Sequence, residues 1–339
     1  MTTTSKSKSG PIGLAVIGTG GFGRGMAERI AGSQKLSLIS CYDVSQDSCK
    51  QVAEQFGCRA ASSIDEVLND DSVEGVVIVT PNFAHRENTL DAAAAGKHVF
   101  VDKPIANEIE DAYAMIDACR NAGVTLAVGH NFRRYGSHRK LKELVDAGVA
   151  GTIVGAEGNF SHAGGMGLTP NLWRYYPEKA PALPLIQLGV HCADTMQCAL
   201  GPIAEVSSFM AHRAIPGENV DVTASVLRFE SGVVGYLGSN YATPSIYYVN
   251  IHGTAASLYS SWGAPVRIVW ARGKGEEVVE GVCVDERTEE LEEFGDCIRT
   301  GAKPEVTGEV GLLNLAVVRA ALKSAQEGRP VKLKELLAR

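Results

Sequence analysis

A set of glycines closely follows the first apolar segment of the chain. Residues 14–17 are Leu-Ala-Val-Ile, and Gly18, Gly20 and Gly23 then have the spacing G-x-G-x-x-G. In a dinucleotide-binding loop the first glycine permits a sharp turn, the second lets a pyrophosphate approach the backbone, and the third lets the next helix pack closely. A helix N-terminus after such a loop favours an anion. The residues that we expect to bind phosphate are Gly18, Gly20, Gly21, Phe22 and Gly23.

A single acid, Asp43, ends the second predicted strand, residues 36–42. Its distance from the glycines is typical of the residue that accepts hydrogen bonds from ribose hydroxyls in a dinucleotide motif. A carboxylate at this place repels a 2′-phosphate, and Val44 and Ser45 follow it rather than an arginine. These features favour NAD over NADP. The alternative is a solvated turn acid that starts the next helix.

Lys103 lies just beyond a predicted buried strand, residues 98–101, and Pro104 follows it. Beside a nicotinamide cation the ammonium form of a lysine is disfavoured, which brings a lysine closer to the range in which it exchanges protons. Lys103 is therefore the first candidate for acid–base chemistry. The alternative is a surface lysine neutralised by Asp102.

His191 is the second candidate. It stands three residues before Asp194 in a segment predicted to begin a helix, so the two side chains share one face. Asp194 could orient the imidazole, which then serves as an acid or a base. The alternative is a core histidine whose hydrogen bonds are satisfied.

Strands and helices alternate through the first 131 residues and position these groups. The predicted strands are residues 14–17, 36–42, 76–79, 98–101 and 124–128, and the predicted helices are 26–31, 47–56, 64–68, 88–95 and 108–121. This alternation predicts an α/β fold, with a doubly wound parallel Rossmann sheet over residues 11–131. Ligands bind such sheets at the carboxyl ends of the strands, where Thr80, Pro81, Asn82 and Asn131 also lie.

The second half of the chain has a different pattern, in which β-like segments dominate. The predicted strands are residues 152–160, 206–211, 220–229, 233–238, 247–252 and 266–270, and helices are expected at 137–147, 291–299 and 309–326. We expect an α+β domain with a large, mostly antiparallel open sheet over residues 132–305, and a C-terminal helix in 306–339 that packs back on the first domain. Period-two alternation predicts one open sheet face, which would form a homodimer or homotetramer.

Composition limits the class of protein. The 339 residues suffice for two domains, and 45% hydrophobic and 21% charged residues are typical of a globular core. A net charge of −7 without long basic runs argues against nucleic acid, and no apolar run reaches the roughly 18 residues that span a bilayer. The eight cysteines contain no C-x-x-C pair, so we expect reduced thiols, a cytoplasmic protein and no metal site. Residues 1–10 have no signal-peptide core and are expected to form a disordered tail.

Together these motifs resemble the Gfo/Idh/MocA family, named for glucose-fructose oxidoreductase and inositol dehydrogenase. The resemblance combines the early G-x-G-x-x-G, Thr80-Pro81 with His85, Lys103-Pro104, the G-x-H of His191, and a C-terminal stretch from Val306 to Val331. It implies a Rossmann domain with a C-terminal open sheet. It also implies hydride transfer between NAD(P) and a carbinol of a sugar, cyclitol or sugar derivative.

The resemblance also implies roles for particular residues. Lys103 and His191 take the positions of the family's catalytic lysine and histidine, while Thr80, Pro81, Asn82 and His85 would line the cofactor together with Lys103. Two departures stand out: Asp102 replaces the usual Glu, and Gln187 replaces the Asp of D-x-G-x-H. Because an amide binds a hydroxyl but does not take its proton, proton transfer would fall to Lys103 or His191. The residues expected around the substrate are Asn131, Arg134, His162, Trp173, Arg174, Gln187 and His191.

Several alternatives stay open. Trp173 could stack on a sugar or belong to the core, and Arg174 could bind a substrate anion or be an ordinary surface residue. Gln187 also suits an NAD-dependent glycoside lyase or hydrolase that oxidises a sugar transiently and then returns the hydride. A nucleotide sensor without turnover is a third possibility, against which Lys103 and His191 argue.

Overall fold

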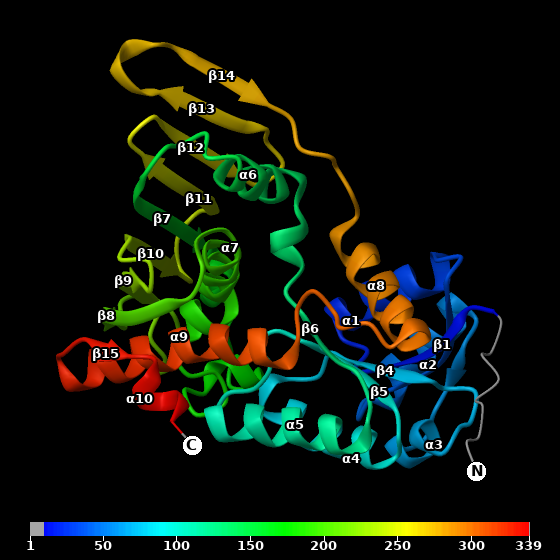
Figure 1. Ribbon diagram of the computed structural model, residues 1–339. Coiled ribbons are helices and arrows are strands. Elements are labelled where there is room, and N and C mark those ends of the chain that lie inside the picture. The colour runs from blue at the N-terminus through cyan, green and yellow to red at the C-terminus, as the bar shows by residue number, and fades with distance from the viewer. Residues whose placement is uncertain (1–9, 339) are drawn as a thin grey trace. The chain divides into compact units, whose positions relative to one another are not determined.

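The computed structural model describes residues 10–338, so nearly all of the predicted disordered tail lies outside the described residues. The chain divides into two compact units (Figure 1). The first contains the described residues up to Ile105, with Glu110–Gly129 and Arg287–Val310; the second contains Ala106–Ile109, His130–Glu286 and the described residues from Gly311 onward. No helix in residues 10–338 combines the length and the apolar character needed to cross a membrane.

The first unit is built on a six-stranded sheet. Its strands are β1 (Ile12–Ile17), β2 (Leu36–Tyr42), β3 (Arg59–Ala60), β4 (Gly75–Ile78), β5 (His98–Asp102) and β6 (Leu126–Gly129). They lie in the order β3-β2-β1-β4-β5-β6, and every pairing is parallel. The helices are α1 (Gly21–Gly32), α2 (Gln46–Phe56), α3 (Ile64–Leu68), α4 (His85–Ala94) and α5 (Ile109–Ala122). The predicted doubly wound sheet is confirmed.

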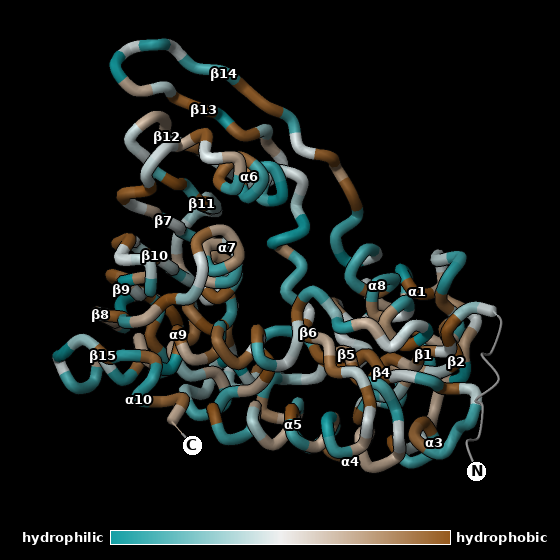
Figure 2. The backbone as a smooth tube through the Cα atoms, in the orientation of Figure 1, coloured by the Kyte–Doolittle hydropathy of each residue, from teal (hydrophilic) through white to brown (hydrophobic). Residues whose placement is uncertain are grey.

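The central strands are apolar because helices cover them. Every residue of β1 and β4 is buried, and apolar residues, brown in Figure 2, run along this part of the sheet. Helix α8 (Glu286–Thr300) completes the core with Leu291 and Phe294, whose ring lies 5.9 Å from that of Phe100. The prediction placed this helix in the second domain, but its apolar face packs in the first unit.

The second unit contains a nine-stranded sheet. Its strands are β7 (Ile153–Ser161), β8 (Ile203–Ala211), β9 (Val222–Phe229), β10 (Val234–Asn240), β11 (Ile246–Gly253), β12 (Ala256–Ser261), β13 (Val266–Trp270), β14 (Glu276–Val279) and β15 (Val331–Lys332). They lie in the order β14-β13-β12-β11-β7-β10-β9-β8-β15. Only the β10–β7 pairing is parallel among these strands, which confirms the mostly antiparallel sheet.

One face of this sheet packs against helices. In β9 the buried residues Thr223, Ser225 and Leu227 alternate with exposed neighbours such as Val226. Helices α6 (Gly136–Asp146) and α7 (Val190–Leu200) lie on one side of the sheet (Figure 1). The predicted alternation therefore separates a helix-covered face from an open face.

The C-terminal segment belongs to this second unit. Most of α9 (Gly308–Glu327) groups with the nine-stranded sheet, because the backbone N–H of Ser208 on β8 donates to the Ser324 hydroxyl at 3.0 Å and β15 pairs with β8. The prediction was a helix in residues 306–339 that packs back on the first domain, and the first unit contains this segment only as far as Val310. The hydrogen bonds of α9 and the short strand β15, which hydropathy does not reveal, decide the placement.

Candidate functional site

The glycine-rich loop has the shape that a dinucleotide requires. Gly18 has φ +100°, and a Cβ there would lie 2.9 Å from the carbonyl carbon of Val79. A Cβ on Gly23 would lie 1.9 Å from the Gly18 oxygen, whereas a Cβ on Gly20 would meet nothing within 4 Å. Packing therefore demands the first and third glycines, while the second leaves an open approach to the N-terminus of α1. These residues fit a bound pyrophosphate.

Asp43 is tied directly to this loop. Its Oδ2 accepts from the backbone N–H of Thr19 at 2.6 Å, and its Oδ1 accepts from that of Ser45 at 2.8 Å. A carboxylate has further acceptor positions, so these bonds orient Asp43 and still allow it to accept from a ribose. The N-cap of α2 is Ser45 rather than Asp43. The structure thus favours a loop-orienting acid over one that merely starts the next helix.

His85 lies behind the strand ends rather than on them. Its ring is buried, with Nδ1 3.0 Å from the Pro104 oxygen and Nε2 3.0 Å from the Thr80 oxygen. Burial lowers the pKa of His85, against the opposing effects of Asp102 and the two carbonyls. The histidine therefore joins the loops that follow β4 and β5. Through these contacts it positions Thr80 and Pro104.

Asp102 and Lys103 end β5. Burial raises the pKa of the Asp102 carboxyl, and the charge of Lys103 opposes that shift. Lys103 itself is half-buried, and its peptide bond to Pro104 is cis. The lysine is thus held in a partly desolvated environment at the carboxyl end of the parallel sheet, where an amine can act on a ligand.

Arg287 lies against the glycine loop in the first unit, and no sequence motif predicted this placement. Its guanidinium carbon lies 4.9 Å from the ring centroid of Phe22, in the first turn of α1. Arg287 stands far from the glycines in the chain, at the start of α8. A basic residue of α8 offered no spacing signal that linked it to the loop.

In the second unit, His191 stands at the start of α7, just after the π-helical turn Leu185–Gly189. The side chain is 5% exposed, and its ring stacks on Phe132 with 3.9 Å between centroids and 23° between planes. Phe160 and Tyr247 extend this aromatic cluster. Stacking therefore fixes the plane of the imidazole.

Asp194 has partners other than the predicted one. It is fully buried and accepts from Nε of Arg133 at 2.9 Å and from Nδ2 of Asn314 at 2.6 Å. Burial raises the pKa of Asp194, but Arg133, His130 and Asn314 outweigh burial and lower it overall. We expected Asp194 to orient His191. Instead, the carboxylate accepts hydrogen bonds from Arg133 and Asn314, which lie far from Asp194 in the sequence.

Three of the predicted substrate residues lie together. Nε of Arg174 donates to Oε1 of Gln187 at 2.9 Å, and the guanidinium carbon of Arg174 lies 4.3 Å from the Trp173 ring centroid. Gln187 is buried, and Trp173 is half-buried. Trp173, Arg174 and Gln187, which the sequence predicted as separate substrate residues, thus form one polar and aromatic cluster.

The other predicted substrate residues have different surroundings. Nδ1 of His162 accepts from the backbone N–H of Gly164 at 2.9 Å, and its ring lies 4.9 Å from that of Tyr241. Asn131 is buried and donates to Oε1 of Glu286 at 3.3 Å, and Arg134 is only 3% exposed. No group of three or more His, Cys, Asp and Glu side chains is placed to hold a metal ion within residues 10–338.

Comparisons with known proteins cover both units. Residues 12–130 match the oxidoreductase family with an NAD-binding Rossmann fold, and residues 138–259 match the GFO/IDH/MocA C-terminal domain. The 1,5-anhydro-D-fructose reductase of Ensifer adhaerens is 30% identical over 91% of this chain and 93% of its own. The NAD(+)-dependent scyllo-inositol 2-dehydrogenase of Bacillus subtilis is 26% identical over 95% and 96%.

A solved structure agrees with this relationship. A presumed NADPH-dependent oxidoreductase of Desulfitobacterium hafniense DCB-2 superposes with a TM-score of 0.93 and 34% identity, over 98% of this chain and 100% of the other. The ranges matched by the family models contain the positions of the glycine loop, Lys103 and His191. The chain belongs to the Gfo/Idh/MocA family of oxidoreductases.

Proposed function

We propose that this protein is an NAD-dependent dehydrogenase that moves a hydride between nicotinamide and a carbinol carbon of a sugar, cyclitol or sugar derivative. The observation that carries the proposal is the half-buried Lys103 at the end of β5, in a sheet whose glycine loop fits a dinucleotide. Relatives named as a sugar reductase and a cyclitol dehydrogenase support the substrate class.

The residues divide the chemistry among them. NAD, when bound, accepts or supplies the hydride. Lys103 exchanges a hydroxyl proton at its Nζ. In the second unit His191, whose ring plane is fixed by stacking on Phe132, is a hydrogen-bonding group for a carbinol oxygen. Gln187 orients a neighbouring hydroxyl, because Arg174 fixes the amide by donating to its oxygen. Trp173 offers an aromatic surface to the sugar ring.

NAD is proposed over NADP because of Asp43. The carboxylate is fixed by Thr19 and Ser45 beside the glycine loop, where it accepts ribose hydroxyls and repels a 2′-phosphate. One relative is described as NADPH-dependent. Titration of the protein with NADH and NADPH by fluorescence separates the two, and tighter binding of NADPH would refute the role given to Asp43.

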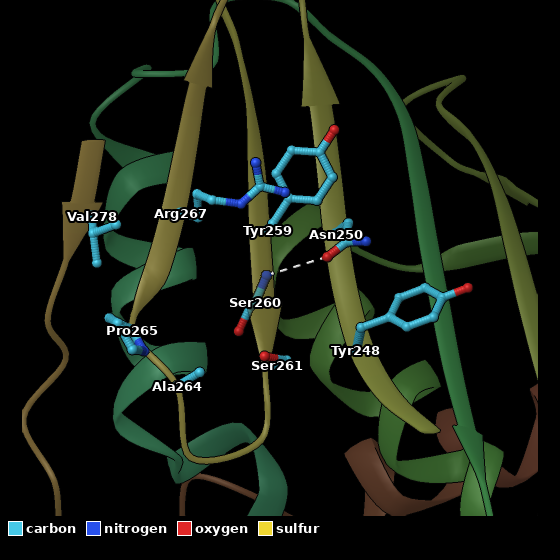
Figure 3. Close-up of a pocket in the computed structure, with 9 residues that line it drawn as sticks. All are labelled: Tyr248, Asn250, Tyr259, Ser260, Ser261, Ala264, Pro265, Arg267 and Val278. Carbon is cyan, nitrogen blue, oxygen red and sulfur yellow. Dashed lines mark hydrogen bonds between the residues drawn. The ribbon is translucent and has the colours of Figure 1, made fainter. Parts of the chain in front are cut away.

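We also propose a homodimer or homotetramer formed through the open sheet face. Strand register places on this face Phe209, Val226, Tyr236, Ile246, Tyr259 and Val278. The side chains of Phe209, Val226 and Val278 are 83%, 55% and 59% exposed. Contact between apolar side chains and water is unfavourable, and packing of this face against a second copy of the sheet would bury them. Beside them, a pocket of about 440 Å³ lies between β11 and β14, with Arg267 over Tyr259 (Figure 3).

All eight cysteines are free thiols, which supports a cytoplasmic location.

The substrate is found by an absorbance screen. Free sugars, cyclitols and glycosides are each incubated with NAD, and reduced nicotinamide is followed by its absorbance. Net NADH with a free sugar or cyclitol supports the dehydrogenase. Cleavage of a glycoside without net NADH would instead support the lyase or hydrolase that Gln187 left open, and no turnover on any compound would favour a sensor.

A further inference from the structure

Three cysteines of the first unit meet at the end of β2. Sγ of Cys58 lies 3.8 Å from Sγ of Cys41, which lies 3.6 Å from Sγ of Cys49. Cys41 is on β2, Cys49 is on α2, and Cys58 stands in the turn between α2 and β3. These are van der Waals distances between sulfur atoms, and the proposed chemistry of the enzyme uses none of the three thiols.

The three thiols differ in access and in bonding. Cys41 and Cys49 are buried, whereas Cys58 is partly exposed beside Gly57, which has φ +71° and open space around it. Cys41 and Cys49 each donate to the backbone carbonyl of the other, at 3.4 Å and 3.2 Å, whereas the thiol of Cys58 donates to the sulfur of Cys41. A reagent from solvent therefore reaches Cys58 first, and Cys41 is the thiol next to it.

We propose that Cys58 and Cys41 form a peroxide-sensitive dithiol. The Cys58 thiolate attacks hydrogen peroxide, so that an S–O bond forms, the O–O bond breaks and one water leaves. The Cys41 thiol then attacks the resulting sulfenic acid, so that the S–S bond forms and a second water leaves. Two thiols lose two electrons and two protons, and one peroxide is reduced to two waters.

The electrostatics of the pair agree with this order. The hydrogen bond with Cys41 lowers the pKa of Cys58, which favours its thiolate. The same bond, with burial, raises the pKa of Cys41, so Cys58 rather than Cys41 is the thiol that attacks the peroxide, and Cys41 gives up its proton to the leaving hydroxyl only when it attacks the sulfenic acid. In the cytoplasm, small thiols would return the pair to its reduced form.

The disulfide would change the position of Asp43, the acid proposed to accept hydrogen bonds from the ribose. A disulfide requires about 2.05 Å between sulfurs, so the 3.8 Å contact must close, by movement of the turn at Cys58 and of the end of β2. Cys41 stands two residues before Asp43, whose bond to Thr19 is 2.6 Å long. We infer that oxidation displaces Asp43 and weakens NAD binding, a consequence that rests on the proposed function.

The test treats the purified full-length protein with hydrogen peroxide and maps its peptides without reduction. Trypsin cleaves after Lys35, Lys50 and Arg59, so Cys41 and Cys49 share the peptide 36–50 while Cys58 lies in 51–59. The expected product links these two peptides with the loss of two hydrogens, and the link persists in Cys49→Ser. A disulfide confined to 36–50, or no link while the exposed Cys283 is oxidised, would overturn the proposal.

Binding measurements test the second step. Oxidation should weaken NAD about fivefold, the effect of one weakened hydrogen bond, and dithiothreitol should restore the affinity. Cys58→Ser should lose both the link and this response, whereas the control Cys283→Ser should keep both. A linked protein with unchanged affinity would refute the coupling to Asp43. If the reduced protein fails to bind NAD, the proposed function is wrong, but the peptide link still decides whether the dithiol exists.

Discussion

The buried ion pair of Asp194 and Arg133 makes a prediction whose size follows from the structure. Asp194→Asn keeps the shape of the side chain but removes the charge that neutralises Arg133, which is itself only 8% exposed. Removal of one partner from a buried pair leaves an uncompensated charge and costs about 3–5 kcal/mol. Because the amide keeps part of the hydrogen bonding with Asn314, we expect the lower end, about 3 kcal/mol, in urea unfolding at pH 7.

The pH dependence of this loss identifies the group responsible. The folded-state pKa of Asp194 is lowered from 3.8, so its stabilisation is complete above that value and is lost as the pH falls below it. The difference between wild type and variant should therefore stay constant from pH 8 to pH 5 and shrink only in stronger acid. The control, Asp146→Asn, breaks an exposed pair with Lys142 and should cost at most about 0.5 kcal/mol. A loss as small as this control, or one that changes between pH 6 and 8, would show that the pair does not carry the stability.

Three further variants test the proposed function. Lys103→Ala should lower turnover about a thousandfold, the range of general acid–base catalysis, and leave NAD affinity nearly unchanged in a fluorescence titration. The control is Lys50→Ala, on the exposed side of α2. Full activity of Lys103→Ala would exclude proton transfer by this amine. Asp43→Ala should weaken NADH about tenfold by loss of charged hydrogen bonds and weaken NADPH less, and equal losses for both would contradict the role of the carboxylate. Val226→Glu should dissociate the oligomer, because the interface would bury an unpaired charge, and light scattering would then give a smaller mass. The control Val282→Glu, at a residue that is 81% exposed outside the sheet, should leave the mass unchanged. An unchanged mass for Val226→Glu would exclude this face as the interface.

Hydrophobic patterning predicted the fold well where strands are apolar and bounded by turn residues. Strand β2 has the predicted limits, and β13 has them as well. The strands β12 and β14 were missed because their sequences, Ala-Ser-Leu-Tyr-Ser-Ser and Glu-Glu-Val-Val, combine few strand-favouring residues with Ala, Ser or Glu. They exist because β11 and β13 offer edges to pair with, and such tertiary contacts are invisible in a local window.

Helix α1 shows a similar limit. It begins at Gly21 although the sequence predicted a start at Met26, since glycines normally mark a loop. At the start of α3, the Ser63 hydroxyl accepts from the backbone N–H of Glu66, and the Glu66 carboxylate accepts from the backbone N–H of Ser62. The sequence predicted the limits of this helix, residues 64–68, but not the bond with Ser62.

The site was predictable residue by residue but not in its pairings. Gly18, Gly20 and Gly23 have the packing that their spacing implied. No motif in the sequence marked Arg133 or Asn314, yet both donate hydrogen bonds to Asp194. His85 was expected at the cofactor, although both its nitrogens face loop carbonyls. Such pairings join residues far apart in the chain, and no periodicity or spacing encodes them.

Gln187 determines which groups can move a proton. An aspartate at this position would face the Nε–H of Arg174, 2.9 Å from the present amide oxygen, and the guanidinium would stabilise its charged form and weaken it as a base. The amide has no such proton chemistry, so Arg174 and Gln187 act together as a rigid hydrogen-bonding group beside Trp173. In the mechanism proposed above, this group selects the substrate hydroxyl, whereas Lys103 exchanges the proton. Because the proposal gives the two tasks to different residues, we expect substitutions of Arg174 or Gln187 to change the preferred substrate more than the hydride transfer itself.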